Sequence, residues 1–391
     1  MAATSQDRSG YLSVLRVPGM PAVYFAHAVS MAGTLAAEVA LSILVFQRTG
    51  SPLLSALVLV CTFLPYAVGG TFSGITDRWP ARRVLVGCDL VSAGCVAAML
   101  VPGIPVPALL GLLFVSGIVA PVFQGARAAS LAQLLDAGTF PVGRSLLRTV
   151  SQTMVLVGFG LGGALVAAVG PTWLLAGDAV SFLLSAVLIG GWTPATPVSA
   201  PGEGRRVGGV RYVLAHRRLR RLLALSLAVP AFASVPDGLA VSYTAQTGTG
   251  PELAGVLFTG YAVGTVAGEI VVARLSPAAR RRLVAPLALA SQLPGVLFLV
   301  TPPLPLAALL LVVSGSGFAF NQGLDPLILA ETEESHRGRL FTLQSSGLMT
   351  VQGVGIALAG VLGTAIGPGA VIGSAALTGA AVVLVLLRRA L

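Results

Sequence analysis

Carboxyl groups stand inside two of the most apolar stretches of this sequence. Glu38 lies in the stretch that begins at Met20, and Asp237 lies in the stretch that begins at Arg221. A charged side chain among apolar residues is costly, and a carboxyl group there can hold a proton until water or a cation favours its loss. We therefore predict that Glu38 and Asp237 handle protons or cations. The alternative is a structural hydrogen bond, or solvation near a membrane surface.

Three further side chains share a helical face with Glu38. His27, Met31, Thr34 and Glu38 follow one another at spacings of 4, 3 and 4 residues, which places them on one side of an α-helix. Lipid would penalise such a stripe, so we expect it to face the interior or a water-filled cavity. His27 taken alone is more often a satisfied interior histidine than a proton carrier.

A second group of polar candidates lies later in the chain. Tyr261, Thr265 and Glu269 recur every fourth residue and so form another stripe. Glu269 is a candidate for the cavity or for a gate. Asn321 is a further cavity candidate, and Asp325 is expected to join an inner gate or to cap helix ends.

One short polar segment combines an acid with several bases. It contains Asp77, Arg78, Arg82 and Arg83, and Asp89 follows it at a distance from which it can pair with these arginines. The Asp77 carboxylate can accept hydrogen bonds from a helix N-terminus and bind a guanidinium. These residues therefore form a candidate gate at one end of the molecule.

The elements that carry these residues are predicted to be membrane-spanning helices. Only 10% of the 391 residues are charged and 55% are hydrophobic, whereas ordinary soluble domains are about 25% charged. This composition excludes a soluble enzyme. A bilayer is crossed by about 20 apolar residues. Twelve such helices are predicted at 20–46, 53–75, 84–101, 105–125, 146–169, 172–192, 221–244, 252–273, 283–301, 304–326, 340–366 and 369–387.

The arginines predict the orientation of these helices. All basic residues are Arg, and all except Arg48 fall in tails and connections that lie on one side of the membrane when the N-terminus is inside. The positive-inside rule then places both termini in the cytoplasm of a multi-pass protein of the cell inner (plasma) membrane. The net charge of +10 is explained by this orientation, so nucleic acid is not expected as a partner.

A polar connection divides the chain into two halves. Residues 193–220 are rich in Pro, Gly and Arg, and they separate an N-terminal six-helix half, 1–192, from a C-terminal six-helix half, 221–391. The triplet Val-Ser-Gly at 115–117 recurs at 313–315. A Gln-Gly pair follows each triplet after the same interval, at 124–125 and at 322–323. Repeats of this kind are typical of transporters whose site lies between the halves, near the bilayer midplane.

The polar segment around Asp77 resembles the signature loop of the major facilitator superfamily. Residues 73–83 read Ser-Gly-Ile-Thr-Asp-Arg-Trp-Pro-Ala-Arg-Arg, with Ser73 and Pro80 in place of two glycines of that pattern. The resemblance covers the chain from Met20 to Leu387. It implies an all-α membrane protein with twelve transmembrane helices in two pseudo-symmetric halves, and a loop that latches the outward-open state.

Other segments resemble the twelve-helix drug:proton antiporter branch, which includes macrolide and siderophore exporters. Gly158, Gly162 and Gly163 match the packing glycines of an exporter motif, whereas Phe159 replaces its Pro. The remaining matches are Ala126-Arg127-Ala128-Ala129, Asp178-Ala179-Val180-Ser181-Phe182 and Arg337-Gly338-Arg339-Leu340-Phe341. The resemblance adds Arg127 to the gate.

The function predicted from these features is secondary active export. The expected substrates are hydrophobic or amphipathic small molecules, such as drugs or natural products, exchanged for protons by alternating access in a monomer. A proton-coupled importer or uniporter of a small organic solute is one alternative, and a receptor or scaffold that does not transport is another. The sequence has no Gly-x-x-x-x-Gly-Lys phosphate loop. An ATP-driven pump in one chain is therefore excluded, and the energy source would be the proton gradient. Enzymatic constellations are absent from the sequence, so we expect no enzyme, cofactor or metal.

Overall fold

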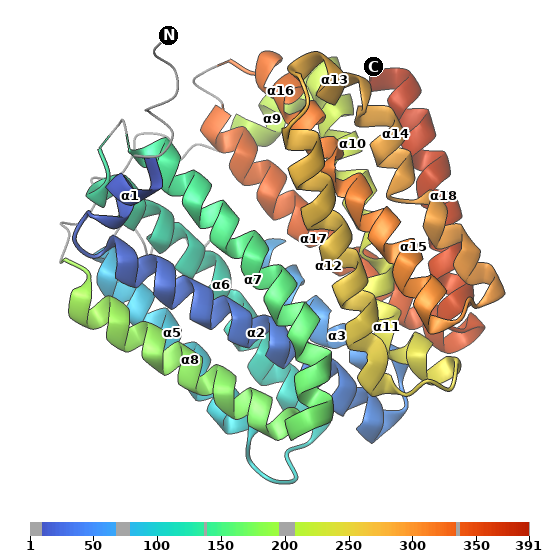
Figure 1. Cartoon of the computed structure of the whole chain (residues 1–391), viewed down its shortest axis with the longest axis horizontal. Coiled ribbons are helices and arrows are strands. Elements are labelled where there is room, and N and C mark those ends of the chain that lie inside the picture. Colours follow the sequence, from blue (N-terminus) through green and yellow to red (C-terminus); the bar gives the residue numbers. More distant parts are fainter. Residues whose placement is uncertain (1–9, 68–78, 137–138, 195–207, 334–336, 391) are drawn as a thin grey trace.

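The structure is a computed structural model that describes residues 10–67, 79–136, 139–194, 208–333 and 337–390. All regular elements in these residues are helices, and the helices form two bundles whose chain ends lie at the same end of the molecule (Figure 1). This arrangement confirms the all-α fold with two six-helix halves.

The first six spans follow a short helix, α1 (Gly10–Leu15). They are α2 (Met20–Thr49), α3 (Pro52–Phe63) continued by the 3-10 turn η1 (Leu64–Ala67), α5 (Ala81–Met99), α6 (Val106–Leu134), α7 (Phe140–Val169) and α8 (Pro171–Trp192). A tight turn at Gly170, with φ +83°, joins α7 to α8 and leads directly into Pro171 at the start of α8. Glycine adopts this conformation without strain, so two long helices can run antiparallel with almost no loop.

The last six spans contain more interruptions. They are α10 (Arg217–Ala233) with α11 (Val235–Gln246), η3 (Pro251–Leu253) with α12 (Ala254–Ala273), α14 (Val284–Ala290) with the 3-10 helix η4 (Leu293–Val300), α15 (Leu304–Ser316) with η5 (Gly317–Phe320) and α16 (Asn321–Ala330), α17 (Arg337–Ile366), and α18 (Pro368–Ala390). Two short helices, α9 (Gly208–Ala215) and α13 (Pro277–Arg282), lie between spans.

The number of spans agrees with the twelve expected. Within the described residues, nine helices are long and apolar enough to cross a membrane, and two shorter apolar segments, Pro52–Ala67 and Val284–Val300, accompany them. The twelfth is α5, which is 19 residues long but begins with Ala-Arg-Arg and contains Asp89. The protein is therefore a multi-span membrane protein.

Several helix ends differ from those expected. The fourth span continues to Leu134 rather than 125, so Arg127 lies inside α6 and not in a connection. The seventh span is broken at Ser234, two residues before Pro236, because proline lacks the N–H that would bond to the carbonyl of Phe232 and continue the helix. The tenth span tightens to 3-10 geometry at Gly317–Phe320. The expected end of the second span, beyond Ala67, lies outside the described residues.

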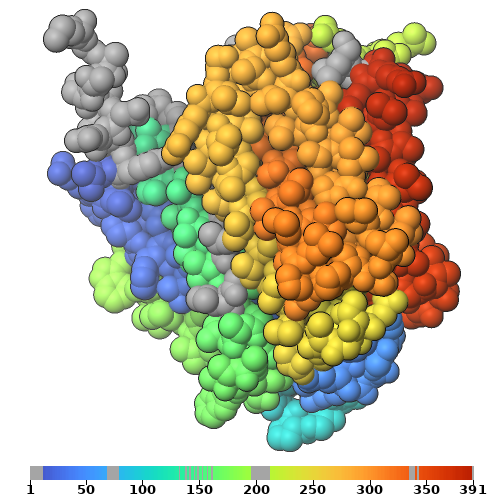
Figure 2. Space-filling model, turned by 45° about the vertical axis from the view of Figure 1, so that its right-hand side comes forward, coloured from blue at the N-terminus to red at the C-terminus, as the bar shows by residue number. Residues whose placement is uncertain are grey.

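The two halves meet at the end of the molecule opposite the chain termini. Phe159 of α7 stacks on Phe258 of α12 with ring centroids 5.3 Å apart. Gln47 of α2 donates a hydrogen bond of 2.9 Å to Glu252 of η3. Figure 2 shows α7 in green lying against the yellow start of the second half on this lower part of the surface.

The hydrophobic clusters show the same asymmetry. The cluster at the end opposite the termini, which we call the closed end, contains residues of both halves. Val39, Ile43 and Val166 pack there against Val235 and Leu239. Near the termini each cluster belongs to a single half, one around Tyr24 and Leu131 and another around Leu219, Leu340 and Leu387. Apolar burial therefore joins the halves at the end opposite the termini and along α3 and α17, where Leu59 and Val60 cluster with Ile356. The bundles diverge toward the termini (Figure 1).

Candidate functional site

Glu38 lies on α2 beside the seam between the halves, and it is only 4% exposed. Thr62 of α3 lies near its carboxyl group, and the Thr62 hydroxyl donates to the carbonyl of Val58 at 3.4 Å. The other ionisable side chains near it are Tyr66 of η1 and Asp178 of α8. Among the described residues no arginine pairs with Glu38. A buried carboxylate without a cation is strongly disfavoured, so the neutral, protonated form suits this position.

Asp178 is a second buried acid on the same side of the first half, at 3% exposure. Thr34 Oγ1 donates to Asp178 Oδ1 at 3.4 Å, and Ser181 Oγ lies 3.3 Å from the same oxygen. Gly33 permits this contact between α2 and α8, because a Cβ there would lie 2.8 Å from Asp178 Oδ1. Thr34 and Glu38 are one helical turn apart, so the two acids occupy neighbouring positions along α2.

Asp237 is the corresponding acid of the second half. It lies in the first turn of α11 and is half-buried, with Tyr261 of α12 nearby. Its neighbours Val235 and Leu239 belong to the hydrophobic cluster that also holds Val39, the residue after Glu38. The two acids predicted from the sequence therefore both border the closed seam, one from each half.

His27 belongs to a different group, although it shares the predicted stripe with Thr34 and Glu38. Its Nε2 lies 2.8 Å from Ser151 Oγ of α7, and its Nδ1 is hydrogen-bonded by the guanidinium of Arg127. A guanidinium can only donate, so Nδ1 accepts and Nε2 carries the hydrogen. The imidazole is thereby held as one neutral tautomer. Met31, in the middle of the predicted stripe, is half-buried.

Asp89 forms a buried contact within the first half rather than a pair with the arginines around residue 80. Its Oδ2 accepts a hydrogen bond of 2.6 Å from Ser185 Oγ of α8, and Asp89 is 1% exposed. Arg127 is the described cation whose charge acts on it. The part of this bundle nearer the chain termini therefore contains Asp89, Arg127, His27 and Ser151 on four different helices, α5, α6, α2 and α7.

The second half has its own polar group nearer the termini. Gln322 of α16 donates to Glu269 Oε2 of α12 at 2.5 Å. Gln344 of α17 donates to Asp325 Oδ1 at 3.3 Å and to Ser226 at 2.8 Å. These contacts tie α12, α16, α17 and α10 together, which suits the gate role predicted for Asp325 and Glu269.

The remaining predicted residues divide between described and undescribed parts. Asn321 donates to Phe318 O at 3.3 Å within its own span. Asp77 and Arg78 lie outside the described residues. Arg82 donates to the carbonyl of Gly190 on α8, and Arg83 is exposed. The structure therefore describes the predicted gate except for Asp77 and Arg78.

Two of the glycines predicted to mediate packing hold α7 against α2 within the first half, and the third lies at the seam between the halves. Gly158 faces Leu35 of α2, Gly162 faces Ala36, and Gly163 touches Gly255 of the other half. A Cβ on Gly163 would lie 2.5 Å from Gly255 Cα. This close approach of α7 to α12 requires glycine at position 163. It does so although Phe159 replaces the proline of the exporter motif.

Sequence reasoning did not identify the partners of Glu38. Thr62 and Tyr66 are spaced four residues apart on the second span, and Asp178 and Ser181 three apart on the sixth. These spacings indicate a polar face on each of the two helices. Only the packing of both helices against α2 places these faces near Glu38. The described residues contain no group of three or more His, Cys, Asp or Glu side chains that could hold a metal ion.

A family model described as a transmembrane secretion effector matches residues 9–323 of this chain. The chain belongs to that family. With it, the protein is a member of the major facilitator superfamily and a secondary transporter rather than an enzyme. No curated protein matches the sequence.

Solved structures of transporters show the same fold. A bacterial homologue of the human lysosomal transporter Spinster, inward-facing and unoccupied, matches with a TM-score of 0.70 at 13% identity over 99% of this chain and 96% of that chain. An inward-facing bacterial homologue of the iron transporter ferroportin matches with 0.69 at 15% identity, over 94% and 98%. A POT family transporter in complex with a thioalcohol-conjugated peptide matches with 0.72 at 11% identity, over 94% and 95%.

Proposed function

We propose that this transporter exports hydrophobic or amphipathic small molecules in exchange for protons, and that Glu38 and Asp237 carry the protons. The observation behind this proposal is the position of the two acids. Each belongs to one half, each borders the seam that must open and close, and neither pairs with an arginine among the described residues. A carboxyl group in that position changes its access to water whenever the halves rock.

The Arg-rich end, where both termini lie, is assigned to the cytoplasm of the inner membrane. The positive-inside rule supports this orientation. The halves are then sealed by Phe159, Phe258 and the Gln47–Glu252 hydrogen bond on the outer side, which corresponds to an inward-facing state. In that state the next half-cycle would open the outer seam and expose the acids to external protons.

Export is favoured over import by the description of the matching family as a secretion effector. An apolar lining around the acids suits an apolar or amphipathic solute: the seam cluster consists of Val, Ile, Leu, Ala, Phe and Tyr side chains. The single-chain arrangement already contains both halves of the pathway, and we therefore propose a monomer.

The test uses the purified full-length protein in liposomes that contain a pH-sensitive dye, with the fluorescent lipophilic cation ethidium as probe. The wild type should move ethidium when a proton gradient is imposed and should move protons when an ethidium gradient is imposed. Glu38→Gln should abolish the gradient-driven step while retaining downhill exchange. Glu331→Gln is the matched control, because Glu331 pairs with Arg218 at 2.9 Å and is partly exposed outside the spans.

Ethidium movement that ignores the proton gradient in the wild type would contradict proton antiport and favour a uniporter. Gradient-driven transport by Glu38→Gln, with the pH dependence of the wild type, would place the coupling group elsewhere, and Asp237→Asn is then the next variant to measure.

A further inference from the structure

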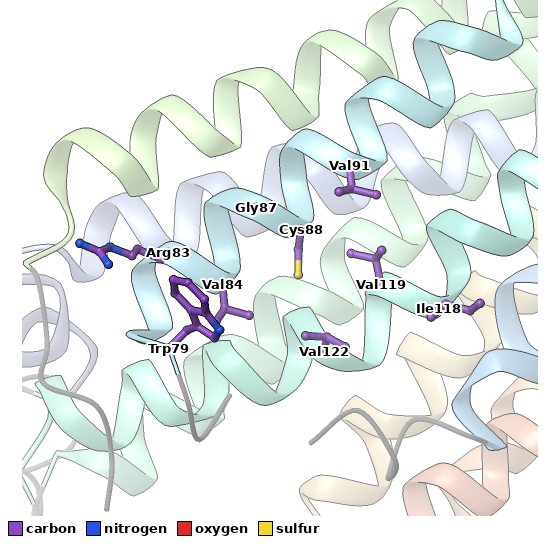
Figure 3. A pocket seen from close by; sticks show the side chains of 9 residues that line it. All are labelled: Trp79, Arg83, Val84, Gly87, Cys88, Val91, Ile118, Val119 and Val122. Carbon is purple, nitrogen blue, oxygen red and sulfur yellow. The ribbon is translucent and has the colours of Figure 1, made fainter. Parts of the chain in front are cut away.

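A groove between α5 and α6 is not used by the proposed transport mechanism. It encloses about 430 Å³ and is lined by Val84, Cys88 and Val91 of α5 and by Val119 and Val122 of α6. Figure 3 shows the Cys88 thiol and Val119 facing each other across the space between these helices. Val91 is 46% exposed, so the groove opens on the outside of the bundle, where a membrane protein meets lipid.

The end of this groove nearest the Arg-rich face has a different chemistry. Arg83 and Trp79 stand there, and in Figure 3 the Arg83 guanidinium extends away from the apolar lining. Trp79 is 54% exposed, a position typical of tryptophan at a membrane–water interface. Arg83 is exposed and pairs with no acid among the described residues, whereas its neighbour Arg82 is held by the Gly190 carbonyl.

The order of these residues matches the order of parts in a lipid molecule. From Arg83 to Val91 the helix rises about 12 Å along the groove. A cation and an indole thus stand at the interface, and an apolar slot continues from them into the hydrocarbon region. Gly87 keeps the slot open, because nothing lies within 4 Å of the position where its Cβ would be.

We propose that this groove binds one anionic phospholipid, with its phosphate on Arg83 and an acyl chain along Gly87, Cys88 and Val91. A guanidinium suits phosphate because its N–H groups match the oxygens in a fork. A zwitterionic lipid would fill the slot equally well, but its positive group would oppose the net positive charge at this end. Basic pockets between transmembrane helices on the cytoplasmic side are suited to anionic headgroups.

The chain offers a direct probe for this site. It has three tryptophans, and Trp173→Phe with Trp192→Phe leaves only Trp79 as a reporter. Brominated lipids quench a tryptophan that they touch, so liposomes of phosphatidylcholine with increasing dibromo-phosphatidylglycerol measure the relative affinity at Trp79. The expected result is a preference of about fivefold for phosphatidylglycerol over phosphatidylcholine, which corresponds to about 1 kcal/mol for one arginine near the surface.

Two variants in the same background test the two parts of the site. Arg83→Gln should remove the preference while leaving quenching by dibromo-phosphatidylcholine, and Gly87→Leu should reduce quenching by both lipids. Gly94→Leu is the matched control, since Gly94 is also exposed on α5 with nothing within 4 Å, but it does not line the groove. It should behave as the parent.

Equal quenching by the two lipids in the parent protein, or an unchanged preference in Arg83→Gln, would overturn the proposal. Quenching that falls as the protein concentration in the membrane rises would also overturn it, because a second copy of the chain would then occupy the groove. None of these outcomes depends on proton antiport, so the lipid site and the proposed function fail separately.

Discussion

Thr34 joins α2 to Asp178 of α8 by a hydrogen bond of 3.4 Å, and Glu38 follows Thr34 by one helical turn. The hydroxyl therefore anchors one buried acid directly beside another. Two carboxyl groups so close in an apolar interior are disfavoured when both are ionised, and they titrate as a pair rather than singly. The protonation of Glu38 should accordingly depend on Asp178, a residue that lies on a helix away from the seam.

Asp178→Asn is the first variant to make. The amide oxygen can still accept from Thr34, so the fold should survive, while the negative charge beside Glu38 is removed. We expect the pH dependence of ethidium-driven proton flux to change, because a second titratable carboxyl group no longer lies beside Glu38. Thermal unfolding in detergent should remain close to the wild type.

Asp178→Leu separates this effect from a structural one. It leaves the Thr34 hydroxyl without its acceptor, whereas Ser181 still donates to the backbone carbonyl of residue 178 at 2.8 Å. The melting temperature should fall, because a buried polar group without a partner costs about 1–3 kcal/mol. An unchanged pH profile in a well-folded Asp178→Asn protein would show that Asp178 is only a structural acceptor.

Gln47→Ala should weaken the outer seam. The Gln47–Glu252 hydrogen bond of 2.9 Å joins the halves at an exposed position, so its net contribution is about 1 kcal/mol. Its loss should raise the population of the outward-open state several-fold. The measurement is labelling of a cysteine introduced by Val166→Cys, which is buried in the cluster that joins the halves, with a membrane-impermeant maleimide in whole cells. Labelling no faster than in the Val166→Cys parent would contradict a latch at this pair.

Gly163→Leu tests the seam more severely. Gly163 and Gly255 bring α7 and α12 into backbone contact, and no side chain fits between them. The larger residue should hold the outer side open, abolish turnover and make the cysteine introduced by Val166→Cys react at its maximal rate. Gly177→Leu is the control, because a Cβ at Gly177 of α8 meets nothing within 4 Å. A Gly163→Leu protein that transports normally would show that the halves need not close here.

The sequence predicted the spans well because membrane helices differ from other segments in composition. It misplaced Arg127, which it assigned to a connection, because the residues after Phe123 become small and polar although the helix continues to Leu134. The pairing of Asp178 with Thr34 could not be predicted from the sequence. The two residues are 144 positions apart, and only the packing of α8 on α2 brings them together. Hydropathy indicates which residues lie within the membrane. It does not indicate which helices pack against one another, and this packing decides which side chains are in contact.

His27 provides the last prediction, because its two nitrogens are both engaged. Arg127 donates to Nδ1 and Nε2 faces Ser151, so the ring is fixed as an acceptor for a half-buried guanidinium and has no free nitrogen with which to carry a transported proton. His27→Ala should leave Arg127 without that acceptor and lower the melting temperature by several degrees, whereas His27→Gln, whose amide oxygen can accept, should restore part of the loss. His216→Ala should change nothing, since His216 is exposed in the linker region. The pH profile of transport should be the same in His27→Gln as in the wild type, and a shifted profile would return His27 to the list of proton carriers.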